Sequence, residues 1–110
     1  MDITVTPADG YAVVAVEGRL TAPGVARFRD AVDDAIAARS ARVVVDLSRT
    51  EFIDSSGIGA LIGGLKAARL ADGDLRIADV PPAVARVLTL TNLDRVLRAY
   101  PKAEAAFDGQ

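Results

Sequence analysis

Residues 54–69, which read DSSGIGALIGGLKAAR, are the stretch from which the fold of this chain follows. After the two serines, apolar residues recur every three or four positions, which is the spacing of one buried face of a helix. That face consists of Ile58, Leu61, Ile62 and Leu65. Serine is a preferred N-cap residue, so we expect Ser55 or Ser56 to begin a helix that covers residues 56–70.

The same helix contains four glycines, and each lowers its helix propensity by roughly 1 kcal/mol relative to alanine. They are Gly57, Gly59, Gly63 and Gly64. At about 100° per residue, the side opposite the apolar face carries only small residues. These are Ser56, Gly59, Ala60, Gly63 and Ala67. A face without large side chains lets another backbone approach closely, so we expect it to be a docking surface.

Length and composition limit the class of protein. The chain of 110 residues fits a single domain, residues 1–110, with a hydrophobic core of its own. No apolar run reaches the roughly 18 to 20 residues of a membrane span, and the N-terminus lacks the pattern of a signal peptide. We therefore expect a cytoplasmic protein without a membrane span. A net charge of −2 offers no basic surface, so direct nucleic-acid binding is not expected.

The residue types present also argue against an enzyme. The chain has no cysteine and no histidine, so it lacks thiol chemistry, the commonest general base near neutral pH and the commonest metal ligand. The sequence Gly57-Ile58-Gly59 lacks the third glycine of a dinucleotide-binding fingerprint. Asp46 and Asp54 are interpreted as turn and capping residues. No catalysis, cofactor, metal or small-molecule ligand is therefore expected.

Periodicity and turn residues predict the elements before the glycine-rich helix. The chain opens with a β-hairpin, strands 3–6 and 11–16 joined by a turn at residues 7–10. A helix follows Thr21 and ends near Arg39. Residues 42–47 are rich in β-branched side chains and are expected to form a central strand. Residues 48–51 are expected to be a polar connection, and Phe52 and Ile53 an apolar anchor for the next helix.

The elements after the glycine-rich helix continue the alternation. They are a strand at residues 75–78, a helix opened by Pro81 and Pro82, a strand at residues 95–99 and a last helix at residues 101–107. Strands that alternate with helices after a hairpin predict an α/β fold with a mixed sheet. We expect about four to five strands and four helices.

The paired hydroxyls at the helix start suggest a function besides capping. Unpaired backbone N–H groups and the positive end of the helix dipole stabilise negative charge at a helix N-terminus. A serine exposed there is a good acceptor of a phosphoryl group, and the ester would carry about −1.5 to −2 charges beside Asp54. A docking face bordered by such a group is typical of an interaction surface regulated by phosphorylation.

These residues resemble the STAS domains, and specifically the bacterial anti-sigma factor antagonists. The resemblance rests on DLS at residues 46–48, FIDSSGIG at residues 52–59 and the helix that follows at residues 61–66. It extends more loosely through GRL at residues 18–20, LRI at residues 75–77 and residues 84–97. It therefore covers essentially the whole chain and implies the STAS fold.

The resemblance further implies a partner-switching cycle. In this cycle the unphosphorylated antagonist binds an anti-sigma factor, itself a serine kinase that holds ATP and Mg²⁺, and so releases the sigma factor. The kinase phosphorylates the antagonist, and a PP2C-type phosphatase resets it. Carried onto this chain, Ser55 is the phosphorylated residue. The residues that would shape its loop and contact the partner are Asp54, Ser56, Gly57, Gly59, Ala60, Gly63 and Ala67.

One position departs from the family pattern. Members often carry an aspartate after Gly-x-Leu, whereas this chain has Thr21 after Gly18-Arg19-Leu20. Thr21 is expected to cap the first helix, but it supplies no negative charge near Ser55. The leading hypothesis is an antagonist switched at Ser55. The alternative is a non-switching STAS adaptor subunit of a membrane transport complex, which would co-purify with an ATP-binding-cassette subunit.

Overall fold

The structure is a computed structural model that describes residues 1–38 and 41–107. Over those residues it has a six-stranded sheet and three α-helices. The strands are β1 (Asp2–Ala8), β2 (Tyr11–Leu20), β3 (Arg42–Asp46), β4 (Thr50–Ile53), β5 (Asp74–Ala78) and β6 (Ala99–Tyr100). The helices are α1 (Val25–Ala37), α2 (Ser55–Leu70) and α3 (Pro82–Leu90). The predicted α/β class with a mixed sheet is confirmed.

The strand β2 organises the sheet, whose order is β1-β2-β3-β5-β6. It pairs antiparallel with β1 on one side and parallel with two strands in succession on the other, first β3 and then β4. The register shifts between Gly18 and Arg19, and Gly18 has a φ of +100°, which glycine adopts without steric strain. This bulge lets the end of β2 follow β4 towards the start of α2.

The opening hairpin is confirmed, with a shorter turn than predicted. Ala8 pairs with Tyr11, so only Asp9 and Gly10 connect the strands. Pro7 is part of β1 and lacks an N–H to donate, which an edge strand tolerates because one side has no partner strand.

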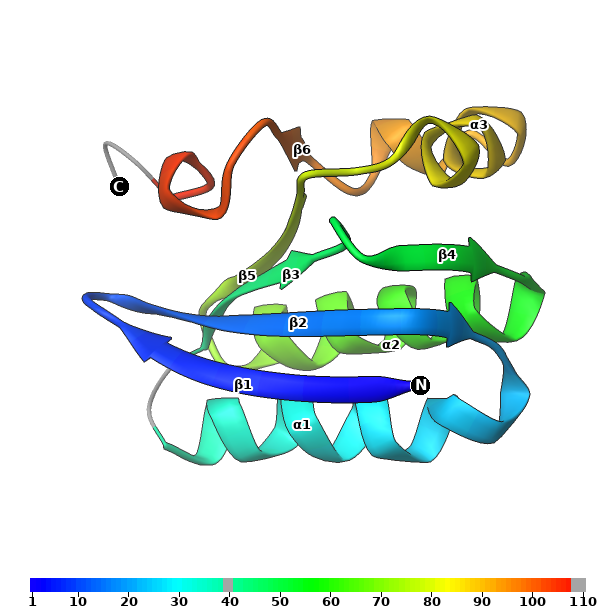
Figure 1. The fold of residues 1–110 in the computed structure, drawn as a ribbon. Coiled ribbons are helices and arrows are strands. Elements are labelled where there is room, and N and C mark those ends of the chain that lie inside the picture. The colour runs from blue at the N-terminus through cyan, green and yellow to red at the C-terminus, as the bar shows by residue number, and fades with distance from the viewer. Residues whose placement is uncertain (39–40, 108–110) are drawn as a thin grey trace.

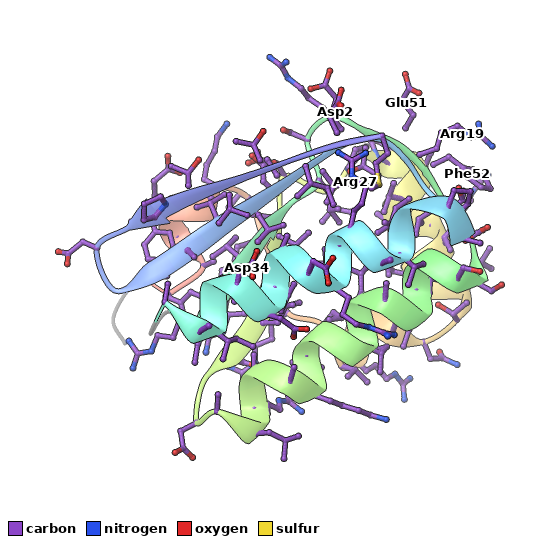
Figure 2. All side chains as sticks on the ribbon, turned by 90° about the horizontal axis from the view of Figure 1, so that it is seen from below. Asp2, Arg19, Arg27, Asp34, Glu51 and Phe52 are labelled. Atoms are coloured by element: carbon purple, nitrogen blue, oxygen red, sulfur yellow. The ribbon has the colours of Figure 1, made fainter. Side chains whose placement is uncertain are left out.

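The helices α1 and α2 lie side by side on one face of the sheet, as both Figure 1 and Figure 2 show. Phe28 and Val32 of α1 and Leu61 and Leu65 of α2 are all buried in the core between these helices and the sheet. The predicted central strand is β3, where residues 43–45 are completely buried. A continuous run of valines therefore fits a strand covered on both faces.

The opposite face of the sheet is covered by the residues that follow β6 (Figure 1). Ala106 and Phe107 pack with the buried residues Val44 of β3 and Ala78 of β5. The ring of Phe107 also stacks on that of Tyr11, with 6.2 Å between ring centroids. The sheet therefore has a second, smaller apolar cluster away from α1 and α2.

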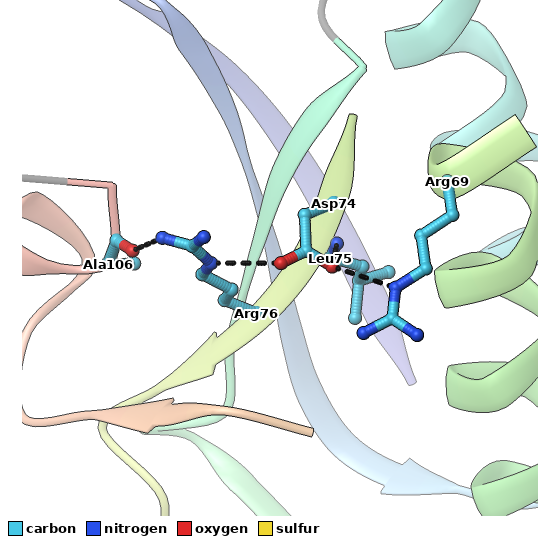
Figure 3. Close-up of polar contacts among 5 residues, drawn as sticks. All are labelled: Arg69, Asp74, Leu75, Arg76 and Ala106. Carbon is cyan, nitrogen blue, oxygen red and sulfur yellow. Dashed lines mark hydrogen bonds and ion pairs between the residues drawn. The ribbon is translucent and has the colours of Figure 1, made fainter. Parts of the chain in front are cut away.

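A buried arginine holds this segment in place (Figure 3). Arg76 of β5 is 5% exposed, and its Nη1 donates to the carbonyl oxygen of Ala106 at 2.6 Å. Its Nε donates to Oδ2 of Asp74 at 3.1 Å, and its guanidinium lies 4.3 Å from the ring centroid of Phe107. A buried charge is tolerated when it is paired and hydrogen-bonded in this way.

The structure corrects the prediction for residues 48–51. Residues 50 and 51 open β4 instead of belonging to a polar connection. Thr50 is buried, and its Oγ1 donates to the carbonyl oxygen of Val16 at 2.8 Å. A threonine at this place looks polar in the sequence, but its hydroxyl is satisfied by the neighbouring strand.

Two further predictions near the C-terminus are wrong. Of residues 95–99, expected to be a strand, Arg95 ends a 3₁₀ turn (Leu93–Arg95), residues 96–98 form a connection, and only Ala99 belongs to the two-residue β6. Residues 101–107, expected to be a helix, contain only a 3₁₀ turn (Ala103–Ala105). A helix this short is marginal without packing, and here the chain instead places Ala106 and Phe107 on the sheet. The predicted end of the first helix near Arg39 lies outside the described residues.

Candidate functional site

The start of α2 is capped by Asp54, which confirms the capping role interpreted for this aspartate and makes the expected serine N-cap wrong. Oδ1 of Asp54 accepts a hydrogen bond from the backbone N–H of Gly57 at 3.0 Å, and its carbonyl oxygen accepts from the N–H of Ile58 at 2.9 Å. The backbone of Asp54 is extended, which is the usual conformation of an N-cap residue. The cap therefore lies one residue earlier, and Ser55 becomes the first residue of the helix.

This placement leaves Ser55 available. Its side chain is exposed, and in the described part of the chain it makes no hydrogen bond, because Asp54 already satisfies the N–H of Gly57. Ser56 is half-buried. Of the two hydroxyls that the sequence left as candidates, Ser55 is thus the one that another protein can reach more easily.

The glycine at residue 57 is required by the fold of the chain itself. A Cβ built on Gly57 would lie 2.7 Å from Cγ1 of Ile53 and closer still to the carbonyl oxygen of Leu20. The backbone that approaches this glycine therefore belongs to β2 of the same molecule. Gly57 therefore lets the end of β2 and the first turn of α2 come close together.

The small-residue face of α2 is divided between the core and the surface. Ala60 is buried, and a Cβ built on Gly64 would lie 2.9 Å from Cδ1 of Leu75, so these positions pack towards the sheet and α1. Gly59 and Gly63 are exposed, and a Cβ there would meet nothing within 4 Å. The prediction of one bare face is therefore wrong for Ala60, because α2 packs against both the sheet and the neighbouring α1 and so buries a wide arc of its surface.

Four exposed residues form a stripe along α2 that begins at the predicted phosphorylation site and precedes the exposed Arg69 and Leu70 at the end of the helix. It consists of Ser55, Gly59, Gly63 and Lys66, which we call the α2 stripe. At about 100° per residue these positions stay on one side along the helix. Beside the stripe, a groove of about 280 Å³ runs between α1 and α2, lined by Arg29, Val32, Asp33, Ala60, Gly63, Gly64 and Ala67. Ala67 is half-buried and lines this groove, so it lies at the edge of the α2 stripe.

Thr21 lies beside the start of α2 but does not cap α1 through its side chain. Leu20 pairs with Ile53 at the ends of β2 and β4, and the N–H of Asp54 donates to the carbonyl oxygen of Leu20 at 3.4 Å, so Thr21 and Asp54 follow the two paired strand ends. The carbonyl oxygen of Thr21 accepts from the N–H of Gly24 at 2.9 Å, and no side-chain cap bond forms. Pro23 explains this, because it lacks one of the N–H groups that a capping hydroxyl would bind.

A pair of side chains near the site was not recognised in the sequence. Ile53 is buried as expected of an apolar anchor, but Phe52 is 40% exposed. The guanidinium carbon of Arg19 lies 4.5 Å from the ring centroid of Phe52, and the two residues pair across β2 and β4. Figure 2 shows the two side chains together near the edge of the molecule. Burial along β4 does not alternate, since Thr50 and Ile53 are buried while Glu51 and Phe52 are exposed, so alternation in the sequence would not have indicated this pair.

Within residues 1–38 and 41–107, no group of three acidic, cysteine or histidine side chains could hold a metal ion. Nor does any helix in that part of the chain have the length and apolar character needed to cross a membrane.

Comparison with known proteins places the chain in a family. A family model described as "Mlab, STAS domain" matches residues 3–99. The anti-sigma F factor antagonist of Paenibacillus polymyxa is 30% identical over 92 residues, which cover 83% of this chain and 79% of the relative. A STAS-domain containing protein of Pseudomonas aeruginosa is 30% identical over 100 residues, covering 89% of this chain and 98% of the relative.

A solved structure agrees with these sequence matches. The crystal structure of an anti-sigma factor antagonist from Mycobacterium paratuberculosis superimposes with a TM-score of 0.82 at 27% identity, covering 94% of this chain and 87% of that one. The family model alone spans most of the chain, and the sequence relatives and the solved structure agree with it. The chain therefore belongs to the STAS-domain family.

Proposed function

We propose that this protein is an anti-sigma factor antagonist controlled by phosphorylation of Ser55. In its unphosphorylated form it binds an anti-sigma factor that is a serine kinase, and the sigma factor is released. The observation that carries the proposal is the exposed hydroxyl of Ser55, which does not serve as the N-cap. Ser55 is the first residue of α2 and of the α2 stripe. The relative named as an anti-sigma F factor antagonist supports the same reading.

The helix start favours the phosphorylated product. The γ-phosphoryl group of ATP would pass to Oγ of Ser55, whose proton is lost as ADP leaves. The helix dipole places partial positive charge at this end, and the first-turn N–H groups of Ser55 and Ser56 are not used by the Asp54 cap. Thr21, unlike the aspartate common in the family, adds no negative charge that would oppose the phosphate.

The same phosphate would weaken partner binding. It adds about −1.5 to −2 charges at the head of the α2 stripe, close to the carboxylate of Asp54. A dianion must lose much of its hydration to enter an interface, which costs free energy unless the partner supplies matching cations. A PP2C-type phosphatase would restore the binding-competent form, and we place the whole cycle in the cytoplasm.

A pull-down followed by phosphorylation tests this function. The tagged wild-type protein should recover a small ATP-dependent kinase, and that purified kinase with ATP and Mg²⁺ should transfer labelled phosphate to it. Ser55→Ala should bind the kinase and take up no label, and Ser55→Asp should bind at least about tenfold more weakly because it mimics part of the charge.

Three outcomes would contradict the proposal. Labelling of Ser55→Ala would move the site, with Ser56 as the next candidate. Equal affinity of Ser55→Asp and wild type would remove the charge switch. Recovery of an ATP-binding-cassette subunit in place of a kinase would favour the transport adaptor, to which none of the named antagonist relatives points.

A further inference from the structure

Phe52 and Arg19 form a stacked pair on the surface at the end of β2 and β4. Phe52 is 40% exposed although it is one of only three phenylalanines in the sequence. The guanidinium of Arg19 lies over its ring at 4.5 Å, within the range of a cation–π contact. The ring is therefore shielded on one side and remains open to another molecule on the other.

The pair is joined to the start of α2 by two structural links. Phe52 precedes Ser55 by three residues, with only the buried Ile53 and the capping Asp54 between them. On the neighbouring strand, Leu20 follows Arg19, and its carbonyl oxygen packs against Gly57 in the first turn of α2. The stacked pair and the head of the α2 stripe are thus held at fixed positions at the same end of the molecule.

The charge of Arg19 is not neutralised by the fold. Three arginines have carboxylate partners: Arg49 pairs with Glu17, and both Arg69 and Arg76 pair with Asp74. In the part of the chain that the structure describes, no carboxylate pairs with Arg19. Stacking restricts the side chain and orients its planar set of N–H donors, which is the geometry that binds a carboxylate through two hydrogen bonds.

We infer that the Arg19–Phe52 pair determines partner specificity, by receiving a carboxylate of the anti-sigma partner on Arg19 and an apolar side chain on Phe52. This rests on the proposed function and adds a second contact to the α2 stripe. Arginine and aromatic residues carry a large share of the binding free energy at protein interfaces. Here the two residues are already in contact before the partner binds, so less side-chain entropy is lost on binding.

The opposing explanation is that Arg19 only shields Phe52 from water. In that case the pair would contribute to the stability of the fold and not to binding. The two explanations predict opposite patterns in stability and affinity, so both quantities are measured on the same variants.

The test measures the affinity of the purified anti-sigma factor kinase for four variants of the full chain. We expect Phe52→Ala and Arg19→Ala each to raise the dissociation constant about tenfold, and Arg19→Glu to raise it further because two carboxylates would then face each other. Arg19→Lys keeps the charge but not the planar donors, and it should fall between wild type and Arg19→Ala.

Matched controls account for size, exposure and charge. Val5→Ala removes an apolar side chain of nearly the same exposed fraction, 41%, from the edge strand β1. Arg42→Ala removes an exposed arginine from the opposite end of the sheet. Both controls should bind as wild type does. In urea unfolding, Phe52→Ala and Arg19→Ala should shift the midpoint no more than these controls.

Salt and a double variant test the chemistry of the contact. The affinity of the wild type should fall as NaCl is raised, and Arg19→Ala should show a smaller fall because one ion pair is missing. The double variant Arg19→Ala/Phe52→Ala should bind little worse than either single variant, since neither side chain acts without the other.

The failure of this inference differs from a failure of the proposed function. If Ser55→Asp loses binding while Arg19→Ala and Phe52→Ala bind as wild type, the stacked pair is not a contact and the inference is wrong. Tighter binding by Arg19→Glu would contradict the inference that the partner places a carboxylate on Arg19. If the wild type binds no anti-sigma kinase at all, both proposals fall.

Discussion

At the scale of single residues, the N-cap at Asp54 determines that the hydroxyl of Ser55 is exposed and takes no part in capping. In the sequence, Asp54, Ser55 and Ser56 are all good N-cap residues, and helix periodicity does not distinguish among them. The choice is made by β4, whose pairing with β2 fixes Ile53 and leaves Asp54 in the extended conformation. A carboxylate cap keeps the serine hydroxyl free for another reaction.

The cap gives a residue-scale prediction about stability. Asp54→Ala should lower the free energy of unfolding by about 1 kcal/mol, because the N–H of Gly57 loses its acceptor. Asp54→Asn should retain most of the stability. Ser55→Ala, the control, should leave it nearly unchanged. Urea unfolding followed by circular dichroism measures all three, and a larger loss in Ser55→Ala than in Asp54→Ala would mean that Ser55 is the cap.

At the scale of the element, the glycines of α2 serve two different purposes. Gly57→Ala should destabilise the protein strongly, because its Cβ would collide with Leu20 and Ile53. Gly59→Ala has open space around it and should stabilise the helix by up to about 1 kcal/mol. The difference between their urea midpoints tests the assignment. Equal effects would mean that the start of α2 adjusts to a side chain at residue 57.

Gly63, one of the two exposed glycines of the α2 stripe, supports a separate prediction about binding. Gly63→Leu should keep the fold, since a side chain there extends into solvent, and should block a partner that docks on the stripe. Thr89→Leu places the same side chain on the exposed face of α3 and is the control. Full binding by Gly63→Leu, with an unchanged circular dichroism spectrum, would exclude this part of the helix from the interface.

Much of the fold and of the candidate site could be predicted from local sequence patterns. The wrong predictions share a cause. The valine run of β3, the Asp-Gly turn and the period of α2 are properties of neighbouring residues, so the sequence reveals them. The role of Phe52 depends on Arg19, which is more than thirty residues away, and the burial of Ala60 depends on the position of α1. Such contacts depend on how the helices and strands are arranged in space, and the periodicity of a short segment gives no information about that arrangement.

At the scale of the whole molecule, Asp74 offers a comparison between a buried and an exposed ion pair. Arg76→Met should cost about 2 kcal/mol, because the carbonyl of Ala106 and the carboxylate of Asp74 both lose a charged donor. Arg69→Met should cost less than about 1 kcal/mol, because its side chain is 56% exposed. Urea unfolding ranks the two variants. If Arg69→Met proved the more costly, the surface pair would be the main support of this end of β5.

Hydrogen exchange locates the effect of the buried pair. In Arg76→Met the amides of residues 103–107 should exchange faster than in wild type, while those of α2 stay protected. Partner binding should then be nearly unchanged, since this segment lies on the face away from α2 (Figure 1). Loss of protection throughout the chain would indicate that the segment is essential to the whole fold.

The position of Phe107 also has a consequence for the order of events during synthesis. Synthesis proceeds from the N-terminus, so α1, α2 and the strands of the sheet leave the ribosome before residues 103–107 do. Until then, Val44 and Ala78 lack the cover that Ala106 and Phe107 give them on their side of the sheet. During synthesis α2 is thus present while the apolar residues on the opposite face of the sheet are still exposed. A chaperone would be needed most in that interval.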